Sequence, residues 1–239
     1  MRRQMLRPLP VLLSALVLIS LLVMPASAAT RPAGGLAGQR VCLDPGHGGS
    51  DPGAVNQAFD LQEKDINLDV SIRLKSLLAA GGAAVVMTRS DDTYQTNNDR
   101  YTFCNAEKAT LLVSVHTNSS TNAAADGAMA LYMKRADQPL AQALYGTLYP
   151  ALQSTAPDPA NFTNYGLSKY ASGVLLKSKM PAVMMEPVLM SNAGEAALLV
   201  QPIYDETGAV ATGCSDFSCR RAQIAQALYD GILAYLASR

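Results

Sequence analysis

The chain contains only two histidines, and each follows a short apolar segment with the composition of a buried strand. His47 ends the sequence V-C-L-D-P-G-H, and His116 ends L-L-V-S-V-H. In an open parallel sheet, ligands gather beyond the carboxyl ends of the strands, so we expect the two residues to meet at one edge. Imidazole nitrogen is a favoured zinc donor. The placement favours a metal site over two unrelated structural histidines.

A catalytic zinc ion usually takes three protein ligands and leaves one position open to water. Glu63 is the carboxylate predicted to complete the set, because it begins a helix directly after the loop that follows His47. Asp44 and Asp51 are nearer in sequence, but each begins a D-P-G turn, where its side chain is expected to bond local backbone N–H groups. The sequence therefore predicts one Zn²⁺ held by His47, Glu63 and His116.

A further carboxylate, Glu186, lies within the strand-like segment P-A-V-M-M-E-P. Burying a carboxylate among apolar residues is costly unless it is paired or functional. Desolvation would raise its pKa towards the range useful to a general base or acid. The alternative is a structural ion pair with Arg89 or Lys177. We predict that Glu186 is the catalytic residue.

These side chains need a sheet whose strands end at one edge. Apolar, strand-like segments alternate with segments of helical periodicity, as in α/β folds. Strands are predicted at 40–43, 83–88, 110–116, 128–133, 174–176 and 182–189, and helices at 64–80, 98–108, 139–152, 194–200 and 221–236. Residues 153–166 carry Pro, Asn and Gly and are predicted to form a surface loop. The expected fold is a single α/β domain, with a mostly parallel twisted sheet of about six strands and helices on both faces.

The amino-terminal residues have the pattern of an export signal. Three arginines precede the apolar run 11–24, and P-A-S-A at 25–28 offers a cleavage site between small residues. The run is short for a membrane span, so an uncleaved anchor is the weaker alternative. We predict three segments: a signal peptide at 1–28, a short linker at 29–38 and the functional domain of a secreted, monomeric protein at 39–239.

Charge excludes nucleic acid as a partner. Removing residues 1–28 takes away three Arg and no Asp or Glu, which leaves 16 basic against 19 acidic side chains, a net charge of about −3. No basic stripe remains, and the chain has no Trp. Specificity must therefore come from a defined site, and no membrane contact is expected after cleavage.

The four cysteines, Cys42, Cys104, Cys214 and Cys219, allow three disulfide pairings in an oxidising compartment. Cys214 and Cys219 are five positions apart in a polar loop, which favours a local disulfide and leaves Cys42 with Cys104. A structural zinc site made of all four is the alternative, although the paired C-x2-4-C spacing of such sites is missing.

Five motifs follow one another along the chain: D-P-G-H-G-G-x-D-P-G-A at 44–54, E-K-x-x-N-L at 63–68, T-R at 88–89, S-V-H-x-N-S at 114–119 and P-A-V-M-M-E at 181–186. Together they resemble the zinc-dependent N-acetylmuramoyl-L-alanine amidases over about residues 39–239. The resemblance implies hydrolysis of the amide bond between the muramoyl lactyl group and L-alanine in peptidoglycan. It also implies that His47, Glu63 and His116 bind zinc and that Glu186 is catalytic.

The remaining matches and departures refine this expectation. Four polar residues also match family positions, and they could support the metal ligands or cap and tie strand ends: Asn67, Arg89, Arg100 and Asn118. Cys104 replaces a family Ala, which supports a Cys42–Cys104 bridge. The interval before Glu186 is too short for the inhibitory helix of some family members, so an open site is expected. The alternatives are a zinc carboxypeptidase or endopeptidase on wall peptides, or a non-catalytic wall-binding module.

Overall fold

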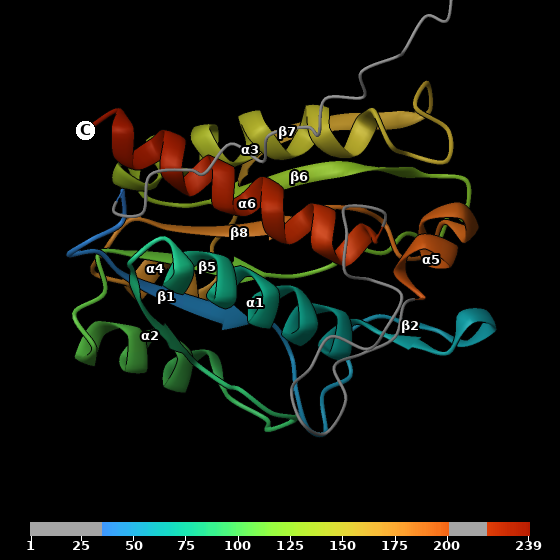
Figure 1. Ribbon diagram of the computed structural model, residues 1–239. Helices are drawn as coiled ribbons and strands as arrows, with labels where there is room; N and C mark the ends of the chain where they lie inside the picture. The colour runs from blue at the N-terminus through green and yellow to red at the C-terminus, as the bar shows by residue number, and fades with distance from the viewer. Residues whose placement is uncertain (1–34, 201–218) are drawn as a thin grey trace, which may run out of the picture. The chain divides into compact units, whose positions relative to one another are not determined.

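The computed structural model describes residues 35–200 and 219–239, which form an α/β domain around one six-stranded sheet (Figure 1). The strand order is β4-β1-β5-β8-β6-β7. In that order the strands are Ala84–Met87, Arg40–Pro45, Leu111–Val115, Ala182–Glu186, Asp126–Tyr132 and Phe162–Lys169. A separate two-stranded hairpin joins β2, Val55–Asn56, to β3, Leu61–Gln62.

The sheet is mostly parallel, as the alternation of elements predicts. β1 runs parallel to β4 and to β5, and β5 runs parallel to β8. β6 is antiparallel to β8 and carries β7 parallel to itself at the outer edge. The carboxyl ends of β1, β5 and β8 therefore lie side by side, which is where a parallel sheet gathers its ligands.

Helices cover both faces of the sheet (Figure 1). α1, α3 and α6 pack over one face and share the larger hydrophobic cluster, whereas α2 and α4 lie over the other face and its smaller cluster. The helices are α1 Glu63–Ala80, α2 Asn97–Ala106, α3 Gln138–Gln153, α4 Gly173–Lys177, α5 Ala193–Leu199 and α6 Arg220–Ala237, with short 3₁₀ turns at Gln57–Phe59 and Arg135–Asp137.

The strand β1 shows how the sequence produces a sheet covered by helices on both faces. Successive side chains of a strand point to opposite faces. Val41 and Leu43 therefore enter the larger cluster, while Cys42 between them enters the smaller one, and all three are fully buried. A strand with helices on both sides has no solvent face, which explains why its sequence is almost continuously apolar.

Two sequence-based predictions of secondary structure are wrong. Residues 174–176 form helix α4 instead of a strand: Ser172 caps the helix by accepting the N–H of Leu175, and the adjacent Val174 and Leu175 are both buried. The predicted loop 153–166 contains the start of β7. This edge strand buries only its first residue, so it lacks the apolar alternation that identifies a strand.

Cys42 and Cys104 form a disulfide that ties β1 to α2 across the smaller cluster. This bond contradicts the four-cysteine zinc alternative. The predicted partner of Cys219, Cys214, lies outside the described residues, so that pairing stays a prediction.

Removing this disulfide is expected to destabilise the protein without changing its site. The bond closes a loop between positions 62 residues apart. A disulfide typically contributes about 2–4 kcal/mol of folding free energy, mainly by restricting the unfolded chain. Urea unfolding of the Cys42→Ala/Cys104→Ala variant would measure the loss. An unchanged unfolding midpoint would contradict the prediction.

The described helices include none that is both long and apolar enough to cross a membrane.

Candidate metal centre and active site

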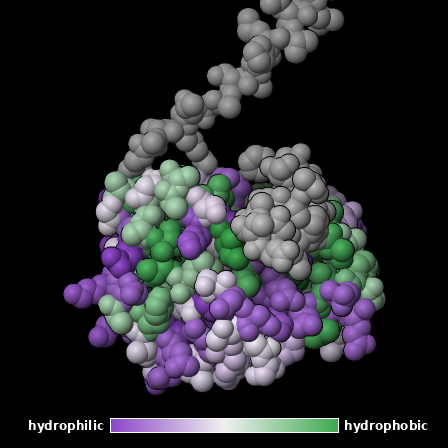
Figure 2. Space-filling view, turned by 60° about the horizontal axis from the view of Figure 1, so that its bottom comes forward, coloured by the Kyte–Doolittle hydropathy of each residue, from purple (hydrophilic) through white to green (hydrophobic). Residues whose placement is uncertain are grey.

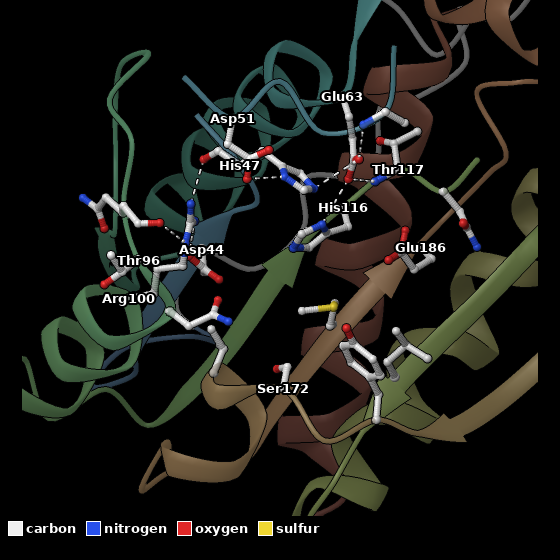
Figure 3. Close-up of a pocket in the computed structure, with 18 of the residues that line it drawn as sticks. Asp44, His47, Asp51, Glu63, Thr96, Arg100, His116, Thr117, Ser172 and Glu186 are labelled. Carbon is white, nitrogen blue, oxygen red and sulfur yellow. Dashed lines mark hydrogen bonds and ion pairs between the residues drawn. The ribbon is translucent and has the colours of Figure 1, made fainter. Parts of the chain in front are cut away.

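Three neighbouring strands deliver side chains to one edge of the sheet. His47 lies two residues beyond the end of β1, His116 one residue beyond β5, and Glu186 is the last residue of β8. Glu63 is the first residue of α1, and its side chain turns towards the same place (Figure 3). The structure thus brings together all four residues that the sequence indicated, although 139 positions separate the first from the last.

The two histidines and Glu63 converge on one point. Each offers a ligand atom, and these atoms lie within 4.8 Å of one another. Nε2 of His47 is 3.1 Å from Oε2 of Glu63, and Nδ1 of His116 is 3.0 Å from Oε1 of Glu63. Two imidazoles and one carboxylate are the donor set of a catalytic zinc site that keeps a position open for water. The residues present therefore fit a divalent metal ion.

The backbone around these ligands allows an unusually close approach. A Cβ on Gly46 would lie 2.3 Å from Cε1 of His116, and one on Gly53 would lie 2.5 Å from Oε2 of Glu63. His47 itself has φ 60°, in the left-handed region that non-glycine residues seldom adopt. Such conformations persist where surrounding contacts hold them, and they cluster at functional sites. Gly46 and Gly53 are therefore needed sterically.

Asp51 orients His47. Its Oδ2 lies 2.8 Å from Nδ1 of the imidazole, and its Oδ1 accepts the N–H of Gly53 at 3.1 Å. The second contact is the local turn bond that the sequence predicted, whereas the first went unpredicted. With Nδ1 bonded to a carboxylate, Nε2 faces Glu63 and the metal position, the arrangement found in carboxylate–histidine–zinc sites.

The charges of His47, Glu63 and Asp51 favour a cation between the predicted ligands. Burial works to lower the pKa of His47, but hydrogen bonds to Glu63 and Asp51 and their negative charges outweigh burial and raise it to about 9. Burial works to raise the pKa of Glu63, yet hydrogen bonds and charge from His116 and His47 hold that pKa far below its usual range. A positive charge is thus strongly favoured at this point, and a metal ion would supply it while displacing the proton from His47.

We expect the Asp51→Asn substitution to weaken metal binding by about 10- to 100-fold, the usual cost of losing a carboxylate behind a histidine ligand. Titration against a chromophoric chelator would measure the dissociation constant. Asp92→Asn is the matched control, because Asp92 bonds Gly49 in the same loop but touches no predicted ligand. Equal metal affinity of the Asp51→Asn variant and the unaltered protein would show that Asp51 serves only the turn.

Asp44 has a structural role, but a different one from that predicted. Instead of bonding local backbone groups, its buried carboxylate accepts from Thr88 Oγ1 at 2.7 Å, Ser114 Oγ at 2.7 Å and Arg100 Nη1 at 2.8 Å. Burial works to raise its pKa, but the charge and hydrogen bond of Arg100, aided by the two hydroxyls, lower it. Ser114 is its register partner on β5, which no local sequence pattern reveals.

Glu186 is half-buried, with Oε2 of its carboxylate shielded from solvent, and it makes no ion pair with the described residues. Its Oε2 has no hydrogen-bond partner there, and the predicted alternatives, Arg89 and Lys177, do not reach it. Burial raises the pKa of Glu186 to about 7; the charges of His116 and His47 lower it slightly, while that of Glu63 raises it. An unpaired buried carboxyl whose pKa lies near neutrality is the physical profile of a general base or acid.

The four residues line a hollow of about 570 Å³. In Figure 3, the His47–Glu63–His116 group lies at one end of this pocket, Thr96 and Arg100 lie along a side, and Ser172 lies across from Glu63. Leu131, Val174 and Met184 contribute apolar surface, and the half-exposed rings of Tyr94 and Tyr170 also line the pocket. The pocket can thus hold a ligand with both polar and apolar parts against the metal position and Glu186.

Two backbone N–H groups also serve the site without any signal in the sequence. The N–H of Thr117 donates to Oε1 of Glu63 at 3.1 Å, and the N–H of Ala54 donates to Oε2 at 2.9 Å. Every residue type except proline can supply such a donor, so the identity of these two residues gives no signal.

The sequence of this chain is similar to those of known amidases. Residues 41–215 match a family model described as N-acetylmuramoyl-L-alanine amidase. The chain is 29% identical to the N-acetylmuramoyl-L-alanine amidase LytC of Bacillus subtilis over 83% of its own length. It is 31% identical to the probable cell wall amidase LytH of Staphylococcus epidermidis over 85% of its length. It spans only 36% of LytC and 60% of LytH, less than two thirds of either relative.

The fold matches solved structures as well. The catalytic domain of CwlV, an N-acetylmuramoyl-L-alanine amidase from Bacillus (Paenibacillus) polymyxa, superposes with a TM-score of 0.68 at 31% identity. The match covers 84% of this chain and 99% of that domain. The correspondence therefore extends over a whole catalytic domain.

Proposed function

Because the chain belongs to the N-acetylmuramoyl-L-alanine amidase family, we propose that it hydrolyses the amide bond between the lactyl group of N-acetylmuramic acid and L-alanine in peptidoglycan. The substrate is a muramoyl-peptide of the bacterial cell wall, and the products are a lactyl-bearing glycan and a free stem peptide.

One observation carries this proposal: the His47–Glu63–His116 group and the unpaired Glu186 share one pocket. A metal group alone would suit a binding module. A buried carboxyl with a pKa of about 7 beside it supports hydrolysis, because amide cleavage needs a proton to leave water and reach an amine. This pairing favours an enzyme over the non-catalytic alternative.

The metal we propose is a single Zn²⁺, held by Nε2 of His47, the carboxylate of Glu63 and Nδ1 of His116. When bound, zinc would lower the pKa of a water molecule and polarise the substrate carbonyl. The buried Glu63 supplies the one negative charge among the ligands, and Asp51 holds the ring of His47 in the orientation that binding requires.

Glu186 moves the proton in this proposal. Its carboxylate takes a proton from the attacking water and then gives it to the nitrogen of the departing L-alanine. Both steps need a carboxyl whose pKa lies near the working pH, and burial at the end of β8 provides that. Leu131, Val174 and Met184 add apolar surface to the same pocket.

For the whole protein we propose a secreted, monomeric wall enzyme. Residues 1–28 serve as a cleaved signal peptide, residues 29–38 as a linker, and residues 39–239 as the catalytic domain. The Cys42–Cys104 disulfide supports an oxidising location. On the face in Figure 2, hydrophobic residues form separate groups interrupted by hydrophilic ones.

Zymography on purified peptidoglycan tests the proposal. We expect clearing by the mature protein, loss of clearing after treatment with a chelator, and recovery on adding zinc. Clearing that persists after the chelator has removed all bound metal would contradict the metal mechanism. No clearing by the fully zinc-loaded protein would favour the wall-binding alternative.

A further inference from the structure

The amide side chain of Asn67, one helical turn after Glu63, joins the three segments that carry the predicted metal ligands. It is fully buried, and its Nδ2 donates both to Oε1 of Glu63 at 3.2 Å and to the carbonyl of Gly46 at 3.4 Å. Its Oδ1 accepts the hydroxyl of Thr117 at 3.0 Å. Gly46 precedes His47, and Thr117 follows His116. A single side chain thus bonds one ligand directly and the chain neighbours of the other two.

The guanidinium of Arg89 makes a second connection between ligand segments. It is 3% exposed, and its hydrogen bonds to described residues all go to main-chain carbonyls. Nε donates to Pro45 at 3.0 Å, and Nη2 donates to Gly46 at 2.8 Å and to Lys64 at 2.8 Å. Lys64 follows Glu63, so Arg89 links the loop before His47 to the start of α1.

Asn67 and Arg89 therefore meet on the same acceptor, the carbonyl of Gly46. This carbonyl belongs to the peptide that leads into His47, whose φ of 60° needs support from its surroundings. Helix capping does not account for Asn67, which lies within α1, four residues after its start. Strand-end bonding accounts for one hydrogen bond of Arg89, the one to Pro45 at the end of β1, but not for those to Gly46 and Lys64.

We propose that Asn67 and Arg89 are positioning residues that fix the metal ligands in their binding arrangement before a metal ion arrives. They touch neither substrate nor metal. They act through Glu63 and through the carbonyls of Pro45 and Gly46. The ligands are therefore already ordered in the folded protein, and the free energy of metal binding is not reduced by the cost of ordering them. The inference rests on the proposed metal site.

The first test compares two substitutions in the same helix. Asn67→Leu keeps the approximate volume but removes all three hydrogen bonds. Ser71→Ala is the matched control, because Ser71 is equally buried one turn later and bonds only the carbonyl of Asn67. Competition with a chromophoric chelator measures the zinc dissociation constant of each folded protein. We expect about a 10- to 100-fold increase for Asn67→Leu and less than about a twofold change for Ser71→Ala.

The second test compares two buried arginines and does not depend on the folding of the Asn67 variant. Arg89→Lys keeps the charge but cannot reach several carbonyls at once. Arg221→Lys is its control, because Arg221 is 2% exposed and bonds Leu199 and Asp69, away from the site. We expect weaker zinc binding only for Arg89→Lys, with thermal melting of the metal-free proteins recording the stability cost of each change.

Metal affinity separates this inference from the proposed function. If Asn67→Leu and Arg89→Lys bind zinc as tightly as the unaltered protein, or if both control variants lose affinity to the same degree, the positioning role is overturned. If the unaltered protein binds no zinc, the proposed function fails first. Weaker binding by the two test variants alone supports the inference, whatever bond the enzyme cleaves.

Discussion

The Glu186→Gln variant is expected to retain zinc and to lose about 10²- to 10⁴-fold in kcat on a muramoyl-peptide, the usual contribution of a general acid–base group. Glutamine has the same shape but cannot accept the proton of the attacking water. The measurement is the release of free L-alanine amino groups from the zinc-loaded protein, with metal content determined on the same sample. A variant with wild-type kcat would exclude Glu186 as the base.

The dependence of activity on pH gives this prediction a second readout. Glu186 acts as a base only when ionised, so activity is present above its pKa and is lost as the pH falls through that value. Burial raises the pKa of Glu186 to about 7, and a bound cation would lower it. The acid limb of the profile is therefore expected at or below about pH 7, and residual activity of Glu186→Gln should lack it.

Glu186→Gln should also change stability in the direction opposite to activity. The raised pKa means that the folded state disfavours the ionised carboxyl, so Glu186 costs stability as the pH rises above the unfolded value near 4.5. The variant removes this cost and is expected to melt at a higher temperature than the unaltered protein at pH 8. Glu107→Gln, which removes a surface ion pair between a half-exposed residue and Arg40, serves as the control that should not gain stability.

The second large effect is expected for His116→Ala, which removes one of three predicted ligands. Zinc affinity should fall by more than about 100-fold, because even the partners behind such ligands are worth 10- to 100-fold. Activity at equal total zinc should fall with it. Equilibrium dialysis of the folded variant gives the affinity, and Lys75→Ala, an exposed residue of the helix that carries Glu63, is the control.

Adding zinc in excess separates binding from chemistry in this variant. If saturating zinc restores wild-type activity to His116→Ala, the residue contributes affinity alone, and its place among the ligands of the reacting metal would need revision. Unchanged affinity in the variant would contradict the ligand assignment outright.

Much of the fold follows from patterns in the sequence. The strands that deliver His47, His116 and Glu186 are buried on both faces, so their apolar runs identify them clearly. The predictions for the edge strand β7 and helix α4 are wrong because each element depends on contacts that local sequence does not show. β7 is held by pairing with β6, and α4 by a capping serine and its contact with the smaller cluster.

The candidate site, like the fold, is only partly predictable from the sequence. The ligand types and their strand-end positions indicate a metal centre, but the partners that hold the ligands come from the tertiary structure. Strand register places Asp44 beside Ser114. Asn67 contacts Thr117 because the start of α1 lies at the end of β5. Such contacts join residues 50 to 70 positions apart, beyond the reach of local sequence patterns.

We propose that this protein cleaves the bond between the muramoyl lactyl group and L-alanine. Mass spectrometry of the products from intact peptidoglycan, with zinc added, tests it most directly. We predict stem peptides that begin with a free L-alanine amino group, together with glycan fragments that keep the lactyl group and carry no amino acid. Products in which L-alanine stays attached to the muramoyl group, with a peptide bond cut further along the stem, would contradict it.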